Sequence, residues 1–171
     1  MKQYIGTKVI LALPMNREDY NVYRGWELPS DEDGTDEGYL VEYPDSPNAN
    51  HAKHAGYISW SPKEQFDAAY RETSGMNFGL ALEAMKKGKK VARSGWNGKG
   101  LFVFKQVPSP IGPDIVPKMT SLPQSVKDEF INRGQGPNYC NQMAIVKQDG
   151  SVDSWVASSS DTFADDWMIV E

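Results

Sequence analysis

The sequence predicts an α+β fold made of two small domains, each a short antiparallel sheet packed with one or two helices. Three observations predict it. Apolar runs of strand length are interspersed with amphipathic helical segments, a Thr-Ser-Gly stretch at 73–75 divides the chain, and Asp149-Gly150 marks a hairpin. The 171 residues are enough for two small domains. We therefore expect one domain at 1–74 and another at 76–171.

The first domain is expected to contain three strands. Residues 4–13 are mostly apolar and predict a largely buried strand, which Pro14 ends. Two more strands are expected at 38–43 and 56–60, on either side of a Pro/Asn-rich loop. Residues 31–37 hold five acids and predict a solvated loop.

Two helices of this domain have recognisable ends. Asn16 is a suitable N-cap for a helix that runs to Arg24, and Gly25 would stop it. Ser61-Pro62-Lys63-Glu64 predicts a second start, with the serine as cap, the proline at the first position and the glutamate closing a capping box. This second helix is expected to run to about Glu72.

The second domain is expected to begin with a helix capped by Asn77 and ended at Gly88, with its apolar residues on one face. Another helix is expected over 123–132, after an irregular loop at 108–123 that holds five prolines. The strands expected in this domain are 90–93, 101–107, 141–147, 151–157 and 167–170.

Charge is divided unevenly between the two parts. Residues 1–75 hold 7 Lys/Arg and 13 Asp/Glu, whereas residues 76–171 hold 11 and 10. Proteins that bind DNA or RNA need a basic face, because phosphate neutralisation supplies most of their affinity. We therefore expect no nucleic-acid polymer as a partner, although a small anionic ligand needs only a few convergent donors.

Little in the sequence points to disulfides, metals or membranes. Cys140 is the one cysteine, so no internal disulfide can form, which fits a reducing cytosol. No apolar run approaches the roughly 20 residues that span a bilayer, and we expect a soluble, cytoplasmic protein without membrane contact or cofactor. His51 and His54 could hold a metal with nearby Asn and Asp residues. Without a third strong ligand at short spacing, they more simply predict a polar loop.

A glycine-rich turn at 93–100 carries groups that suit a flat ligand. Trp96 lies between glycines, which let a ligand approach the backbone closely. A structural tryptophan beside a tight turn would show the same pattern. Asn97 can pair with a base edge or a ribose hydroxyl.

Donors for a phosphate lie in the same turn. Arg93 and Lys99 can face a pyrophosphate, and Gly98 exposes a backbone N–H that can hold a phosphate oxygen. A later stretch adds hydroxyls and a carboxylate that suit a ribose, namely Ser158, Ser160 and Asp161. These eight residues are the predicted ligand-binding set.

The same half of the chain lacks recognisable catalytic groups. It contains no histidine, and Cys140 has no base partner nearby in the sequence. No GxSxG, P-loop or HExxH pattern is present. Asp165 and Asp166 could be paired carboxylates, but they more simply predict polar residues beside a helix end. We therefore expect a binding protein rather than an enzyme.

Three blocks of this half resemble a known family. They are Met76-Asn77-Phe78-Gly79-Leu80-Ala81-Leu82-Glu83-Ala84-Met85, the turn at 93–100, and a C-terminal block that holds Trp155-Val156-Ala157-Ser158 and Ala164-Asp165-Asp166-Trp167. Together they resemble the second type of Thoeris anti-defence protein of phages, over residues 76–171. The resemblance implies a molecular sponge that sequesters signalling nucleotides of the cyclic ADP-ribose type. It also implies a homotetramer with ligands between protomers and, in some members, a separate site for cyclic dinucleotides.

Residues 1–72 resemble a second phage-encoded family, a small accessory domain of tailed phages. The blocks that carry this resemblance are 4–8, 23–29, 37–43 and 56–62. The resemblance implies no activity, but it supports a phage or prophage origin and a boundary near residue 74.

Two alternatives to sequestration remain open at this point. The protein could hydrolyse the same cyclic nucleotides by carboxylate or lysine chemistry, in which case ligand recovered after denaturation would be altered. It could instead be a protein–protein inhibitor of a host defence component, with the acidic first domain as its contact surface, and would then bind no small molecule.

Overall fold

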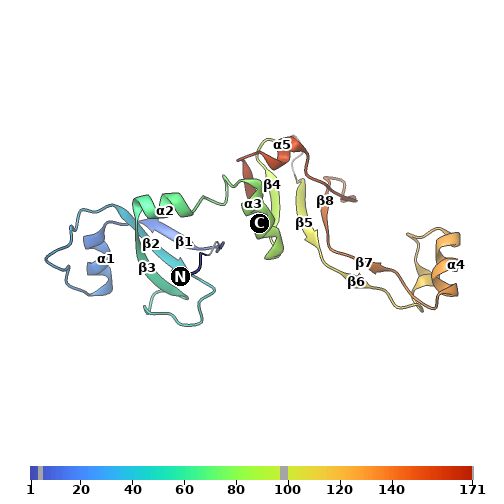
Figure 1. Cartoon of the computed structure of the whole chain (residues 1–171), viewed down its shortest axis with the longest axis horizontal. Helices are drawn as coiled ribbons and strands as arrows, with labels where there is room; N and C mark the ends of the chain where they lie inside the picture. Colours follow the sequence, from blue (N-terminus) through green and yellow to red (C-terminus); the bar gives the residue numbers. More distant parts are fainter. Residues whose placement is uncertain (4–5, 97–99, 171) are drawn as a thin grey trace. The chain divides into compact units, whose positions relative to one another are not determined.

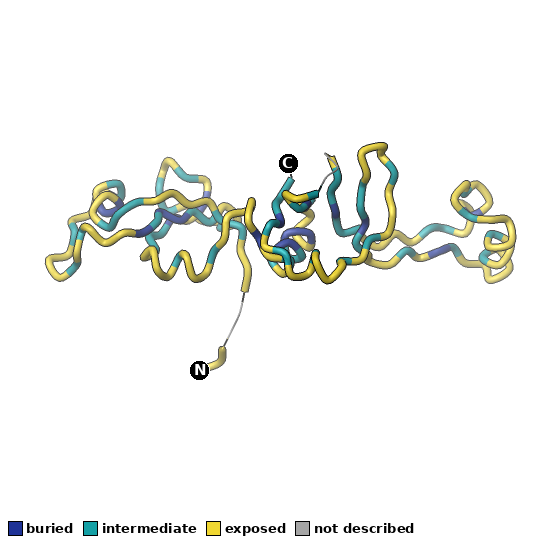
Figure 2. The backbone as a smooth tube through the Cα atoms, turned by 90° about the horizontal axis from the view of Figure 1, so that it is seen from above, coloured by how far each residue is buried: buried dark blue, intermediate teal, exposed yellow. Residues whose placement is uncertain are grey.

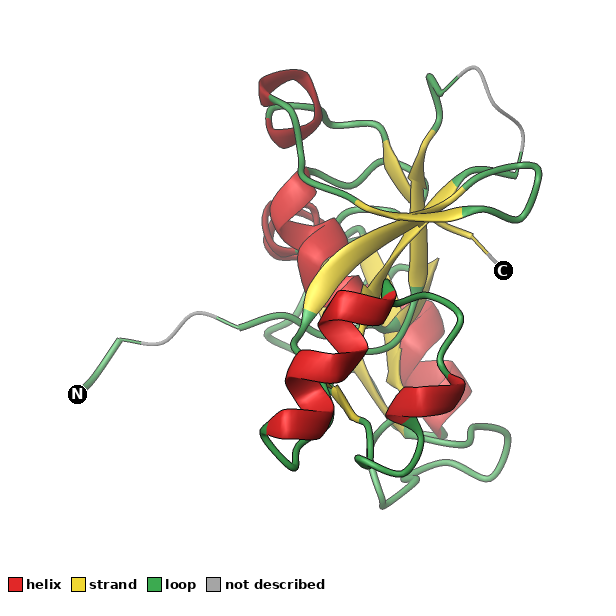
Figure 3. Ribbon diagram, turned by 90° about the vertical axis from the view of Figure 1, so that its right-hand side faces the viewer, coloured by secondary structure: helices red, strands yellow, loops and turns green. Residues whose placement is uncertain are grey.

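The computed structural model describes residues 1–3, 6–96 and 100–170 (Figure 1). The chain divides into two compact units, Met1–Glu72 and Thr73–Glu171. Each unit combines antiparallel strands with helices, which confirms the predicted α+β class (Figure 3). Whether each unit folds alone, as the predicted domains require, stays a prediction. Among the described helices, none is both long and apolar enough to cross a membrane.

The first unit is built on a three-stranded antiparallel sheet in the order β1-β2-β3. Its strands and helices, in chain order, are β1 (Leu11–Pro14), α1 (Arg17–Arg24), β2 (Gly38–Tyr43), β3 (Tyr57–Pro62) and α2 (Lys63–Ala69). Tyr20 of α1, Leu40 of β2 and Ile58 of β3 form its buried core. A β-carbon on Gly38 would overlap the indole of Trp60, so glycine lets that ring lie close against β2.

The ends of α1 match the expectation from sequence. The side chain of Asn16 accepts a hydrogen bond from the backbone N–H of Asp19 at 2.7 Å, which makes it the N-cap. Gly25 follows the helix with φ 69°, the left-handed conformation that glycine adopts without strain.

Three expectations for this unit are wrong. Only Leu11–Pro14 of the expected strand is paired, and all four residues are exposed, since the buried core of this unit is formed by α1, β2 and β3; residues 4–5 lie outside the described chain. The cap of α2 is Pro62, not Ser61, because Ser61 still pairs with Tyr39 in the sheet. The helix ends at Ala69 rather than Glu72, since the next residue is extended.

The two histidines lie in the loop between β2 and β3. His54 Nδ1 lies 2.8 Å from Glu42 Oε2, and His54 Nε2 lies 2.9 Å from the hydroxyl of Tyr23. His51 packs on the ring of Tyr23, with centroids 4.6 Å apart. Both ring nitrogens of His54 therefore tie the loop to α1 and β2, as a polar loop requires.

The second unit is built on a five-stranded antiparallel sheet in the order β10-β4-β5-β8-β9. The strands are β4 (Lys90–Arg93), β5 (Phe102–Gln106), β8 (Gln142–Val146), β9 (Val152–Ser154) and β10 (Trp167–Val170). Helix α3 (Phe78–Lys86) packs on β10, β4 and β5, and the one-turn helix α5 (Ser159–Thr162) lies beside it. Dark blue segments gather on α3 and the adjoining strands in Figure 2.

The start of α3 is fixed from both sides. Asn77 accepts a hydrogen bond from the backbone N–H of Leu80 at 3.0 Å, which confirms the expected cap. Just before it, Met76 exchanges two backbone hydrogen bonds with Trp167, at 2.8 and 3.0 Å. The backbone N–H of Ile169 also donates to the carbonyl of Thr73 at 2.9 Å. The expected linker at 73–75 therefore belongs to the second unit.

Between β5 and β8 the chain leaves the sheet and returns. β6 (Ser109–Pro110) pairs with β7 (Asn138–Tyr139), and this short ribbon leads to a 3₁₀ helix, η1 (Val116–Lys118), and to α4 (Gln124–Asn132) (Figure 1). Val116 is fully buried there. The expected irregular loop at 108–123 thus contains a strand and a 3₁₀ turn, and β7 was not expected at all.

Candidate functional site

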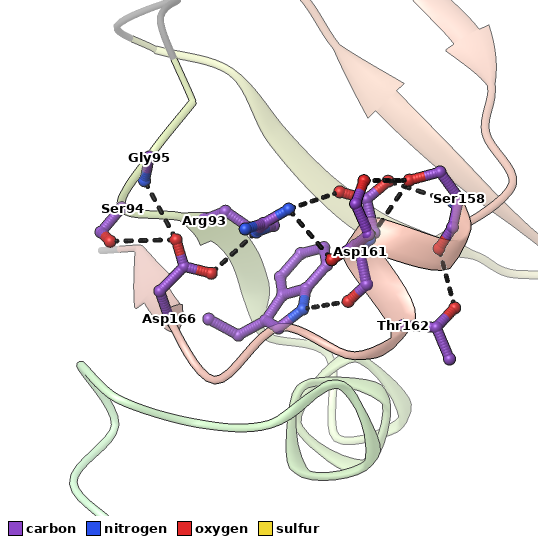
Figure 4. Close-up of polar contacts among 9 residues, drawn as sticks. Arg93, Ser94, Gly95, Ser158, Asp161, Thr162 and Asp166 are labelled. Carbon is purple, nitrogen blue, oxygen red and sulfur yellow. Dashed lines mark hydrogen bonds and ion pairs between the residues drawn. The ribbon is translucent and has the colours of Figure 1, made fainter.

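Arg93 is the centre of the candidate site, where it lies between two carboxylates (Figure 4). It is the last residue of β4 and pairs with Trp167 of β10, so the residue that precedes β10, Asp166, lies beside it. Arg93 Nε donates to Asp166 Oδ1 at 2.7 Å, and Nη1 donates to Asp161 Oδ1 at 3.0 Å. Nη1 also donates to the carbonyl of Ser160 at 3.3 Å.

Asp166 also organises the turn that leads to Trp96. Its Oδ2 accepts hydrogen bonds from the hydroxyl of Ser94 and the backbone N–H of Gly95, both at 3.2 Å. A β-carbon on Gly95 would approach that oxygen to 3.3 Å, so glycine leaves room for this contact. One carboxylate therefore holds both the guanidinium of Arg93 and the turn after it.

Helix α5 presents the second group of polar residues. Ser158 is its N-cap: its hydroxyl donates to Asp161 Oδ2 at 2.6 Å, and its backbone N–H donates to the same oxygen at 3.1 Å. The hydroxyl of Ser160 lies 2.9 Å from that of Ser158. A capping box therefore accounts for these three residues locally, and the arrangement holds Asp161 against Arg93.

Both carboxylates are held in their charged form. The hydrogen bond from Arg93, followed by the backbone N–H of Gly95, lowers the pKa of Asp166. For Asp161, burial acts to raise the pKa, but the hydrogen bonds from Ser158 and Arg93 outweigh it and lower the pKa. The two anions in turn raise the pKa of Arg93. One cation and two anions leave this cluster with a net negative charge.

An aromatic cluster packs beside the polar residues of the site. The rings of Trp96, Trp155 and Trp167 meet edge to face, with centroids 5.5 to 6.2 Å apart. Trp167 is fully buried, as its place on a strand predicts, and its indole N–H donates to the carbonyl of Asp161 at 2.9 Å. Trp96 is only half-buried. It is thus anchored in the core and still partly open to a ligand.

The structure brings together five of the eight predicted ligand-binding residues. They are Arg93, Trp96, Ser158, Ser160 and Asp161. Asn97, Gly98 and Lys99 lie outside the described residues. Sequence reasoning missed Asp166 as a member of the site. Its position directly before the strand that pairs with 90–93 is the signal that could have found it.

The free groups of the site limit its chemistry. Arg93 uses Nε and Nη1 within the protein, whereas Nη2 makes no hydrogen bond to any residue that the structure describes. The hydroxyl of Ser158 donates to Asp161, and within the described residues the side-chain carboxylate of Asp161 bonds only to donors, Arg93 and Ser158, with no base to take up the serine proton. The arrangement is suited to hydrogen bonding and stacking more than to proton transfer.

Comparison with known proteins identifies the second unit. Residues 76–170 match the model of the Thoeris anti-defense 2-like domain, which is more than half of the chain. The chain belongs to the Thoeris anti-defence 2-like family. A Thoeris anti-defense 2 protein of Bacillus phage SP01 is 37% identical over 95 residues, which cover 56% of this chain and 94% of that protein. The resemblance seen in the sequence over 76–171 is confirmed. The family match lies in the second unit, and the resemblance of residues 1–72 to a phage accessory domain stays a prediction.

Proposed function

We propose that this protein is a phage anti-defence protein that binds and sequesters a cyclic ADP-ribose-type signalling nucleotide without cleaving it. Membership of the Thoeris anti-defence 2-like family carries the proposal. The ligand would contact the predicted set, Arg93, Trp96, Asn97, Gly98, Lys99, Ser158, Ser160 and Asp161.

Stacking on Trp96 would supply the first part of the binding energy. The ring is half-buried and is held by edge-to-face contacts with Trp155 and Trp167, so little side-chain entropy is lost when a base stacks on it. Stacking a base on an aromatic side chain contributes about 1–3 kcal/mol.

The polar cluster suits the sugar better than the phosphates. Arg93 is already paired with Asp161 and Asp166, so the cluster is net negative and would repel a pyrophosphate. Ribose hydroxyls can donate to a carboxylate and accept from Nη2 of Arg93, which is unoccupied within the described part of the chain. The phosphates would then lie towards Lys99 and the backbone of Gly98. We therefore propose the ribose, rather than the pyrophosphate first expected from the sequence, as the partner of Arg93.

The same groups support retention of the intact ligand. Asp161 and Asp166 have lowered pKa values, so neither holds a proton at neutral pH that it could give to a leaving group. Residues 76–171 hold no histidine that could act in their place. We therefore favour sequestration over hydrolysis.

Affinity argues for an assembly. A sponge needs nanomolar affinity, about −12 kcal/mol, and a ligand of roughly 35 heavy atoms yields about −10 kcal/mol at the usual −0.3 kcal/mol per atom. Nearly every ligand atom must be contacted, which favours a pocket shared between subunits. Val156 and Phe163, which flank α5, are 82% and 85% exposed, and large apolar side chains this exposed are suited to an interface. A homotetramer with ligands between protomers is the assembly we propose.

The proposal is tested by binding to a panel of immune nucleotides. The protein would be mixed with cyclic ADP-ribose isomers, cyclic dinucleotides, linear ADP-ribose and NAD, filtered, denatured and examined by mass spectrometry. We expect retention of a cyclic ADP-ribose isomer, with or without a cyclic dinucleotide at a second site. Retention of no nucleotide, together with loss of Thoeris defence in cells, would favour a protein–protein inhibitor instead.

A further inference from the structure

The first unit carries two hollows that share the side chains of Arg17 and Trp60. The smaller, of about 280 Å³, is lined by four aromatic residues, Tyr20, Trp26, Tyr57 and Trp60. The larger, of about 490 Å³, is lined by four carboxylates, Asp36, Glu37, Glu64 and Asp67. Because the hollows share two lining residues, they lie next to each other, one on each side of Arg17 and Trp60. We call this pair of hollows the aromatic–acidic groove, with an aromatic half and an acidic half.

The aromatic half offers mainly ring surface. Trp26 is 53% exposed and Tyr57 is 45% exposed, which is unusual for such large rings in one hollow. The amide of Asn50 is occupied by both backbone groups of Ile58, at 2.8 and 2.9 Å. The amide of Asn21 donates to a backbone carbonyl of α1 at 2.9 Å. With both amides engaged, the exposed rings of Trp26 and Tyr57 are the main surface that this half offers, and they suit a ligand that lies flat on them.

A rigid wall divides the two halves. The indole of Trp60 lies against Gly38, and its N–H donates to the carbonyl of Met15 at 2.9 Å. The guanidinium of Arg17 lies over the ring, 4.7 Å from its centre, and is paired with Glu32. The wall is thus held before any partner arrives, and its indole already accepts a cation on its ring.

The acidic half has unbalanced negative charge. Its two cations are compensated, because Arg17 pairs with Glu32 and Lys63 pairs with Asp67 at 3.4 Å. The remaining three carboxylates, Asp36, Glu37 and Glu64, form no ion pair with any residue that the structure describes. Such a hollow repels phosphate and attracts Lys or Arg.

We propose that the aromatic–acidic groove binds an extended, proline-containing segment of a partner protein that carries Arg or Lys at one end. Proline-rich segments form a stiff extended helix whose flat rings dock on aromatic-lined grooves at low cost in entropy. The basic side chain would lie in the acidic half, next to the indole of Trp60. An amphipathic helix fits less well, because only half of the groove is apolar, and nucleic acid is disfavoured by the charge.

Selection from displayed random peptides on the full-length protein tests this inference. Peptides of about ten residues suffice, since they span roughly 30 Å in the extended proline helix. We expect the enriched peptides to contain spaced prolines followed or preceded by Arg or Lys. One enriched peptide, made synthetically and labelled, then serves as the probe in fluorescence anisotropy.

Matched variants localise the binding. Trp26→Ala and Tyr57→Ala should each raise the dissociation constant of the probe at least about fivefold, as expected for a central interface contact. Val22→Ala removes an exposed apolar side chain of α1 that lines neither hollow, and should change nothing. Glu64→Gln should weaken binding about twofold to fivefold at low salt, more than Asp45→Asn, which removes the same charge outside the groove.

Folding of each variant is checked by circular dichroism, and Tyr57→Phe serves as a second variant that keeps the ring. The inference is overturned if no peptides are enriched, if the enriched peptides are acidic or lack proline, or if the folded Trp26 and Tyr57 variants bind as the unaltered protein does.

Discussion

Replacement of Trp96 separates its two roles, which are to close the aromatic cluster and to stack on the ligand. Trp96→Leu keeps an apolar side chain but removes two edge-to-face contacts, with Trp155 and Trp167. Each such contact contributes about 0.5–1.5 kcal/mol, so we expect the free energy of unfolding to fall by roughly 1–3 kcal/mol. Trp96→Phe keeps a ring, so its free energy of unfolding should fall by less.

Binding should respond differently from stability. Loss of the ring in Trp96→Leu is expected to weaken nucleotide binding about tenfold to a hundredfold, whereas Trp96→Phe should stay within about fivefold of the unaltered protein. Isothermal titration calorimetry, at a temperature well below the unfolding midpoint of every variant, measures these affinities. Trp155→Leu is the matched control, because it loses similar aromatic contacts without removing the proposed stacking ring.

The reasoning would be refuted by either of two results. If Trp96→Leu and Trp96→Phe bind equally well, the ring does not stack on the ligand. If Trp155→Leu weakens binding as much as Trp96→Leu does, the effect comes from the cluster as a whole and Trp96 is a structural residue.

Three further predictions follow from the contacts in the second unit. Asp166→Ala should lower the free energy of unfolding by about 1–3 kcal/mol in urea titrations and weaken nucleotide binding, because it frees both Arg93 and the turn to Trp96; unchanged binding would show that the turn needs no such support. Because the pKa values of Asp161 and Asp166 are lowered from 3.8, their stabilising contribution is complete above that pH and is lost as the pH falls through the lower folded values. The midpoint temperature of thermal unfolding, measured from pH 7 to 2, should therefore fall below about pH 4. It should fall less steeply in Asp161→Asn, and an equally steep fall would mean that other groups control acid unfolding. A fragment of residues 73–171 should fold alone and be more stable than 76–171 by about 0.5–1.5 kcal/mol, because only the longer one keeps the hydrogen bond from Ile169 to Thr73; aggregation of both would show that the units share a core.

Local sequence signals predicted most of the second unit. Caps, turns and periodicity act over a few residues, so Asn77, the Asp149-Gly150 hairpin and the strand at 167–170 could be located without knowledge of the fold. Where a local signal competed with strand pairing, the prediction was wrong. Ser61 has the sequence of a cap, but its pairing with Tyr39 keeps it in the sheet.

The site could be predicted only in part, because its key contacts join distant segments. The residue types at 93–100 and 158–161 indicated ligand binding, and the structure places Arg93 within hydrogen-bond distance of Asp161. Nothing local to Arg93 reveals that Asp166 pairs with it, since that contact depends on the register of β4 with β10. The exposure of β1 likewise depends on which elements form the core, here α1, β2 and β3, and an apolar run does not encode that.

The fate of the bound nucleotide tests the central claim most directly. The protein would be mixed with a retained cyclic ADP-ribose isomer at equal site concentration, left for hours and denatured, and the released material separated by chromatography. We predict full recovery of the original nucleotide, because the second unit holds ionised, hydrogen-bonded carboxylates and no histidine. Steady conversion to a linear nucleotide, at a rate proportional to protein and abolished by Asp161→Asn, would contradict sequestration and establish an enzyme.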